Sequence, residues 1–354
     1  MWLFTIAIAL VLAACGGGDA GTSSSPAGED ATADPAESAS ASADATDDGE
    51  TAVVTEEQIQ IGASGSNSWL PIRIAAENGY FADAGLPNLQ FVQIGSAPDA
   101  ANALAAGEIQ FAGLAFERAV LSTQQGRHVQ CVMSIQDTPP SSVVVAADSG
   151  IEPGDWESLA GKTIGVVQGG WSEIVPKYLM QVAGLDVDSV QWTSTPNTGA
   201  MLSALQGGQI DGFSGIEPAQ RQAIAEGYAE MFFDLEDPEN LEEFWPDPFQ
   251  ATCLQAQAEY ASANPEVVAA VREAIVRALG EIHSDPSIAV DFAADAAPDV
   301  DRSVWEESIA ALEVTWSEDG ELSEEAIANV QELLVDFGIL EEALPYEEAV
   351  FTGS

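Results

Sequence analysis

The chain of 354 residues carries 58 acidic and nine basic residues, giving a formal net charge of −49, and 46% of its residues are hydrophobic. That hydrophobic fraction can bury a sizeable core, which excludes wholesale disorder. So few basic residues leave no surface for phosphate backbones, which excludes nucleic acid as a partner. The charge favours a salt-rich habitat over that of an ordinary acidic secreted protein, because salt screens self-repulsion.

Residues 1–15 form an apolar stretch of signal-peptide length, and no apolar run approaches the roughly 20 residues that span a bilayer. The end of the stretch, Leu12-Ala13-Ala14-Cys15, resembles a bacterial lipoprotein signal, which implies that Cys15 is lipidated and begins the mature chain. No Lys or Arg precedes the apolar run, so either the signal is atypical or the start lies upstream. Residues 16–57 are mostly small and acidic, which predicts a disordered tether. We therefore expect an extracytoplasmic protein, anchored by lipid to the outer face of the cell membrane.

From residue 58 onward, strand-like and helix-like segments alternate, which predicts an α/β fold with parallel sheets. A first series has strands at 58–63, 89–94, 110–114, 129–135 and 142–147 and helices at 71–84, 97–106 and 116–125. A second has strands at 163–167, 190–193, 210–213 and 231–235 and helices at 172–182, 198–205 and 219–226. One late strand, 249–257, precedes a helical C-terminal part that includes a helix at 324–337. This order predicts two lobes joined by two crossings: residues 58–145 with 250–354, and residues 146–249.

The loops after the strands are the expected ligand site, because ligands of open α/β sheets bind beyond the carboxyl ends of strands, where helices begin. The candidates are Ser66, Asn67, Trp69, Ser96, Phe116, Glu117, Gln168, Trp171, Ser172, Asn197, Thr198, Ser214 and Glu217. Helix capping is the alternative role for the hydroxyl and amide groups. For the two tryptophans, which offer flat apolar faces to a ligand, the alternative is core packing.

The charged candidates leave the solute class open. Glu117 and Glu217 could pair with an amine, and Arg118 could clamp a carboxylate or sulfonate, unless these are solvated charges at helix starts. Tryptophans with few cations favour a planar, pyrimidine-like or amine-bearing solute, although helix N-termini also bind anions.

Several segments in succession resemble the substrate-binding proteins of ABC importers of the nitrate, sulfonate, taurine and thiamine-precursor type. They are residues 71–86, with Gly79-Tyr80-Phe81, then 103–109, 159–166, 184–187, 204–212 and Glu217-Pro218. The resemblance implies a type II periplasmic-binding fold, two α/β lobes with a ligand cleft between them. It further implies a monomer that needs no cofactor, closes on a small polar solute and delivers it to a permease with an ATPase subunit.

An enzyme on the same fold, as in the fungal pyrimidine-precursor synthases that resemble this family, is the main alternative, and an extracellular sensor module is another. His128 and His283 are the two histidines, and neither belongs to a cluster with metal-ligand or catalytic-triad spacing. We therefore expect neither a metal site nor catalysis.

The remaining cysteines form a potential pair. Once Cys15 carries lipid, Cys131 and Cys253 are left in an oxidising compartment, which favours a disulfide over two buried free thiols.

Overall fold

The structure is a computed structural model that describes residues 54–246 and 248–353. The signal stretch, Cys15 and the tether up to residue 53 lie outside the described residues. None of the described helices has the length and apolar composition needed to cross a bilayer.

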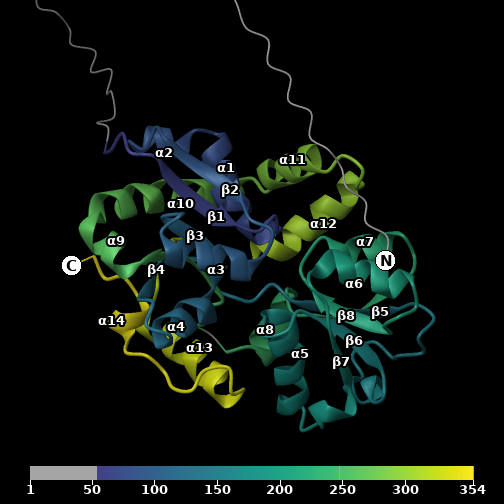
Figure 1. The fold of residues 1–354 in the computed structure, drawn as a ribbon. Helices are drawn as coiled ribbons and strands as arrows, with labels where there is room; N and C mark the ends of the chain where they lie inside the picture. Colours follow the sequence, from purple (N-terminus) through teal and green to yellow (C-terminus); the bar gives the residue numbers. More distant parts are fainter. Residues whose placement is uncertain (1–53, 247, 354) are drawn as a thin grey trace, which may run out of the picture. The chain divides into compact units, whose positions relative to one another are not determined.

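Two five-stranded mixed sheets organise the described chain into two lobes (Figure 1). The sheet of lobe 1 has the order β2-β1-β3-β10-β4, formed by Leu89–Gln93, Ile59–Ala63, Phe111–Ala115, Thr252–Gln257 and Val129–Gln136. The sheet of lobe 2 has the order β7-β6-β8-β5-β9, formed by Gln191–Ser194, Thr163–Val166, Gly212–Gly215, Ser142–Ala146 and Ala229–Asp234. In each sheet the antiparallel strand, β10 or β5, is the one that arrives by a crossing from the other lobe. The type II periplasmic-binding fold predicted from the sequence is therefore confirmed.

Helices cover both faces of each sheet, because neighbouring residues on a buried strand face opposite cores. In lobe 1, α1 (Leu70–Glu77), α2 (Tyr80–Asp83), α9 (Ala258–Ala263), α10 (Pro265–Ser284), α11 (Ser287–Ala296) and α12 (Arg302–Glu313) build one core. The opposite core contains α3 (Ala97–Ala106), α4 (Phe116–Gln124), α13 (Glu324–Asp336) and α14 (Tyr346–Ala349), together with one face of α5 (Trp171–Val182). In lobe 2, Val143 and Val145 of β5 face the core that includes α5, whereas Val144 faces α6 (Thr198–Gln206) and α7 (Ala219–Ala225).

Two helices differ from the sequence prediction. The helix expected at 71–84 is divided into α1 and α2, because Gly79 adopts φ 78°, a left-handed conformation that favours glycine and interrupts the helix. An unpredicted helix, α8 (Pro238–Phe244), begins after Asp237, whose side chain accepts a hydrogen bond from the Glu239 backbone N–H. The Asp-Pro pair is an N-terminal helix signal that sequence reasoning missed.

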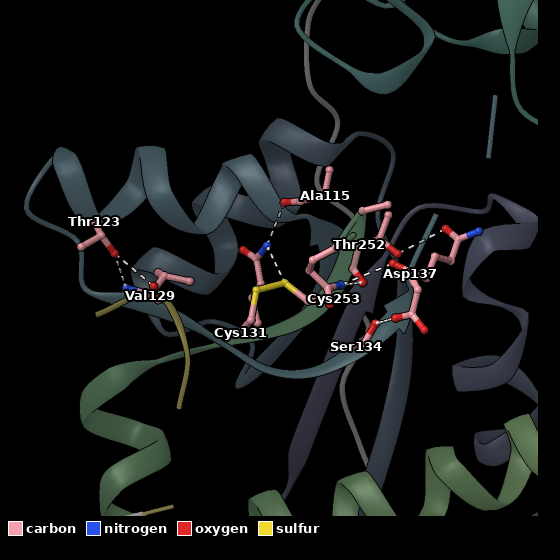
Figure 2. The surroundings of a disulfide bond; sticks show 12 residues. Ala115, Thr123, Val129, Cys131, Ser134, Asp137, Thr252 and Cys253 are labelled. Carbon is pink, nitrogen blue, oxygen red and sulfur yellow. Dashed lines mark hydrogen bonds between the residues drawn. A yellow bond between two sulfur atoms is a disulfide. The ribbon is translucent and has the colours of Figure 1, made fainter. Parts of the chain in front are cut away.

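A disulfide joins Cys131 on β4 to Cys253 on β10, as Figure 2 shows. Both residues are fully buried, and their Cα atoms are 5.7 Å apart. β4 leaves lobe 1 and β10 returns to it, so the bond links the two strands that flank the crossings. The Gln255 side-chain amide contacts the Cys253 sulfur and donates to the Ala115 carbonyl oxygen on β3.

Candidate functional site

A cavity of about 170 Å³ lies between the carboxyl ends of strands from both lobes. Its lining consists of Ser64, Ser66, Ser68, Trp69, Ala97, Gly113, Leu114, Ala115, Glu117, Arg118, Pro140, Val167, Gly170, Trp171, Ser172, Thr198, Ile216 and Thr252. Pockets for drug-sized ligands usually measure about 300–1,000 Å³. The space therefore suits a solute of only a few heavy atoms.

Helices of both lobes begin at this cavity, among them three that follow strands β3, β6 and β7. α4 begins at Phe116, α5 at Trp171 and α6 at Thr198, each one to five residues after the end of the preceding strand. The first turn of a helix carries backbone N–H groups without helical partners and the positive end of the helix dipole. Their convergence gives the cavity a positive backbone potential in a chain that is otherwise strongly acidic.

The two lining tryptophans are fixed by hydrogen bonds through their indole N–H groups. Trp69 donates to the Ser64 hydroxyl at 3.2 Å, within lobe 1, whereas Trp171 donates to the Ala251 carbonyl oxygen at 3.0 Å, on the segment returning from lobe 2. Gly113 of β3 lies directly under the Trp69 ring, since a Cβ atom there would come within 2.6 Å of it. Both tryptophans are 6% exposed and belong to the cores of lobe 1, so core packing, their alternative role in the sequence, is combined with a place in the cavity lining.

Two lining serines stabilise the local backbone as well as the cavity wall. The Ser66 hydroxyl accepts from the Ser68 backbone N–H at the start of a 3₁₀ turn, and the Ser172 hydroxyl accepts from the Val167 backbone N–H at 2.9 Å. Capping and lining were alternative roles for these residues in the sequence. Ser66 combines the two roles, whereas Ser172 lies inside α5, whose N-cap is Gly170, and its hydroxyl holds the preceding loop instead of capping the helix.

Both charged residues of the lining lie at the start of α4. Glu117 is 1% exposed, its Oε1 is 3.5 Å from the Arg118 Nε, and its Oε2 has no hydrogen-bond partner among the described residues. Burial raises the pKa of Glu117 to about 7, although the Arg118 charge and the Glu117 backbone N–H oppose the rise. Glu117 therefore changes charge near neutral pH.

Of the thirteen predicted site residues, the cavity brings together Ser66, Trp69, Glu117, Trp171, Ser172 and Thr198. Three of the others occupy exposed or partly exposed positions at the mouths of the loops. Ser96 caps α3 by accepting from the Asp99 backbone N–H, and Asn197 caps α6 by accepting from the Ala200 backbone N–H. Gln168 is exposed. For Ser96 and Asn197 the structure thus displays the capping role that was the alternative in the sequence.

The remaining four are buried away from the lining. Phe116 belongs to the core of lobe 1, and Asn67 is buried with an unpartnered amide nitrogen. The Ser214 hydroxyl is 3.0 Å from the Ser141 hydroxyl on the outgoing crossing. Glu217 points toward α12, where its Oε2 accepts from the Ser308 hydroxyl at 3.2 Å.

Sequence reasoning left out Thr252 and Pro140, which line the cavity from the two crossings. Only loops after parallel strands were considered, and β10 runs antiparallel, so its first residue, Thr252, meets the same sheet edge as Ala115 at the end of β3. The prediction of an antiparallel returning strand would have identified it.

The histidines lie outside the lining. His128 is exposed, and the His283 Nε2 is 3.3 Å from the Ser317 carbonyl oxygen. Across residues 54–246 and 248–353, no group of three or more His, Cys, Asp or Glu residues is arranged to hold a metal ion.

Solved structures of proteins with the type II periplasmic-binding fold share this architecture. A protein from Bordetella bronchiseptica RB50 is 24% identical, with a TM-score of 0.69 over 83% of this chain and 94% of its own. The alkanesulfonate-binding protein SsuA from Xanthomonas axonopodis pv. citri, bound to MOPS, is 17% identical, with a TM-score of 0.67 over 82% and 95%. The ligand-binding component of an ABC-type import system from Staphylococcus aureus, with zinc bound, is 16% identical, with a TM-score of 0.67 over 83% and 96%.

Residues 66–289 match the family described as NMT1/THI5-like, and the chain belongs to this family. No curated protein matches the sequence closely enough to add a relative.

Proposed function

We propose that this protein is the extracytoplasmic solute-binding component of an ABC importer, which captures a small polar solute between its lobes and delivers it to a permease with an ATPase subunit. The observation that carries the proposal is the cavity itself, which both lobes line with loops at the carboxyl ends of their strands. The names of the Xanthomonas and Staphylococcus structures support a carrier on this fold.

We infer that the solute carries an anionic group, such as a carboxylate or sulfonate. The start of α4, α5 and α6 at the cavity and the Arg118 guanidinium together favour negative charge. Glu117 is compatible with an anion while its carboxyl group is protonated. The walls formed by Trp69 and Trp171 would contact the apolar part of the solute.

The proposed location rests on the N-terminal sequence. Cys15 after Leu12-Ala13-Ala14 would carry the lipid, and the acidic tether would hold the folded lobes away from the membrane. Mass spectrometry of membrane-extracted protein should find a mature chain that begins at a lipidated Cys15. An unmodified Cys15 in a cytosolic chain would contradict the anchor.

A thermal-shift screen in high salt would test the binding function. A panel of nitrate, bicarbonate, taurine, alkyl sulfonates and pyrimidine precursors should contain a solute that raises the unfolding temperature, because a ligand of the folded state stabilises it by about 2.7 kcal/mol at a hundredfold excess over Kd.

Trp69→Ala and Trp171→Ala should each weaken binding of that solute by about 1 kcal/mol or more. Trp192→Ala is the matched control, because Trp192 lies on β7 outside the lining and donates to Val187. Equal binding by all three variants would contradict the site.

An enzyme on the same fold is the second candidate, and the family match to NMT1/THI5-like proteins favours keeping it. The bound solute should be recovered unchanged after incubation with the purified protein. Its conversion to another compound, detected by mass spectrometry of the supernatant, would replace the carrier with the enzyme.

A further inference from the structure

Besides the packing of α5 into a core of lobe 1, the lobes meet where α12 contacts α7. The Ser308 hydroxyl on α12 donates to Glu217 Oε2 at 3.2 Å, and Arg221 Nε on α7 donates to the Glu307 carbonyl oxygen at 3.1 Å. Ser308 and Glu217 are both buried. α12 packs on α11, which packs on α1 of lobe 1, so these two hydrogen bonds join lobe 2 to lobe 1 (Figure 1).

The groups around Glu217 form an acidic cluster with one cation. Arg221 lies 3.5 Å from Glu217 Oε1 and 3.0 Å from Asp234 Oδ2. Glu236, in the turn after β9, is 3% exposed, and neither of its carboxyl oxygens has a hydrogen-bond partner in the described chain. Glu217 and Asp234 thus share the Arg221 guanidinium, and Glu236 adds a buried third carboxyl group. α12 contributes the Ser308 hydroxyl to Glu217 and the Glu307 carbonyl oxygen to Arg221. Full ionisation would leave uncompensated negative charge in a buried contact.

This cluster is adjacent to the cavity along the chain. Ile216 lines the cavity, and the next residue, Glu217, points the opposite way into the contact with α12. Separation of α12 from α7 would remove the Ser308 hydrogen bond and release the loop that carries Ile216.

We propose that Glu217 is a positioning residue that holds lobe 2 and the Ile216 loop against α12 while its carboxyl group is protonated, and that ionisation of the cluster loosens this contact. Protons would then favour the closed arrangement of the lobes, and a rise in pH would favour opening. The device needs no solute and is independent of the solute class inferred above.

The pKa directions give the sign of the effect. Burial raises the pKa of Glu217 to about 7, with Arg221 and Ser308 opposing and Asp234 adding to the rise. Burial, together with Asp234 and Glu217, also raises the pKa of Glu236 well above its usual value. When the contact opens and water enters, both pKa values return toward the ordinary glutamate range. The closed form therefore binds protons more tightly, and its advantage is complete at acidic pH and is lost as the pH rises through about 7.

Distance measurement between spin labels, without any solute, tests the proposal. Glu108→Cys and Thr193→Cys place one label on an exposed position of each lobe, and Cys15→Ser removes the third reactive site, since Cys131 and Cys253 are bonded. In this full-length protein we expect the ratio of open to closed species to rise by up to about tenfold per pH unit between the ordinary glutamate pKa and about pH 7, and to level off above it. Glu217→Gln should abolish most of this response while keeping a hydrogen-bonding group, whereas Glu230→Gln, an exposed acid on β9, should leave it intact.

Ser308→Ala provides a second variant that leaves every acid in place. It should increase the open fraction at acidic pH, because it removes the α12 hydroxyl that holds Glu217. A parent distribution that does not change with pH would overturn the proposal. A Glu217→Gln variant with the same pH response as the parent would also overturn the proposal, even if Glu236→Gln changed that response. If circular dichroism shows that Glu217→Gln is unfolded, an open fraction in Ser308→Ala equal to that of the parent overturns it.

Discussion

Lobe 1 and lobe 2 present unequal faces to the cavity. Lobe 1 supplies both charged side chains, Glu117 and Arg118, and a row of three hydroxyls from Ser64 to Ser68. Lobe 2 supplies two hydroxyls and the apolar Ile216, and each lobe supplies one tryptophan. The difference suggests a division of labour in which lobe 1 recognises the charge of the solute and lobe 2 excludes water from it.

The two faces are also supported differently. In lobe 1 the Trp69 indole is bonded within its own loop, and the Cys131–Cys253 disulfide cross-links the sheet beneath. Residues 142–249, which include the strands of lobe 2, contain no cysteine, and Trp171 of the lobe 2 face is bonded to Ala251 outside its lobe. A face held by its own lobe keeps its shape when the lobes separate. In the face of lobe 2, Ser172 is held within its own lobe, whereas the Trp171 indole depends on the returning segment.

Removal of the disulfide should have the largest effect. Cys131→Ala combined with Cys253→Ala should lower the free energy of unfolding by about 2–5 kcal/mol, because the bond closes a long loop of chain. The sequence separation of the two cysteines is 122 residues. Urea unfolding of the variant and of the oxidised parent would measure the loss.

The reduced parent is the control for this experiment, since it retains both side chains and lacks only the bond. It should lose a similar amount of stability, and the cavity side chains of lobe 1 should become more mobile by NMR than those of lobe 2. Stability equal to that of the oxidised parent would show that lobe 1 does not depend on this cross-link.

The next largest effect concerns the charge of lobe 1. Burial holds the pKa of Glu117 near 7, and an anionic solute beside it would raise that pKa further, so the complex binds a proton more tightly than the free protein. Binding should therefore be strongest below neutral pH and weaken about fivefold between about pH 6 and about pH 8. Calorimetric titration with a solute found in the screen would measure this change.

Glu117→Gln should flatten the pH profile, and Glu108→Gln, at an exposed position of the same lobe, should not. Binding that strengthens as the pH rises through 7 would identify a cationic solute instead. That outcome would restore the amine-bearing solute favoured by the sequence and reverse the role assigned to lobe 1.

The order of strands and helices could be read from the sequence because the central strands, such as β3, β4 and β10, bury both faces, and because glycine, proline or capping residues mark the loops. The two-lobed arrangement followed from one late strand, 249–257, although in the structure it begins at Thr252. The alternation of strand-like and helix-like segments did not reveal the helix break at Gly79 or the additional helix α8. Each depends on one or two residues within an otherwise helical or acidic stretch.

The candidate site was less predictable than the fold. A residue at the end of a strand lies at the right edge, but its side-chain direction depends on tertiary packing. Glu117 and Glu217 show this, because both lie close to helix starts and both are buried, yet one lines the cavity and the other faces α12. Ser308 of α12, the partner of Glu217, follows it in the sequence by 91 residues. No local pattern around Glu217 contains that information.

The smallest expected effect distinguishes a cap from a ligand contact in lobe 2. Asn197 is exposed, and its Oδ1 accepts from the Ala200 backbone N–H at 2.9 Å, while its neighbour Thr198 lines the cavity. Asn197→Ala should lower the free energy of unfolding by about 1 kcal/mol, through the loss of one helix cap. Solute affinity should change less than about twofold, because the backbone N–H groups at the start of α6 remain in place. Asn197→Asp should restore most of the stability, since aspartate caps helices as well as asparagine. Urea unfolding and calorimetric titration on the three proteins would separate the two roles, and a marked loss of affinity with unchanged stability would show that Asn197 contacts the solute after closure of the lobes.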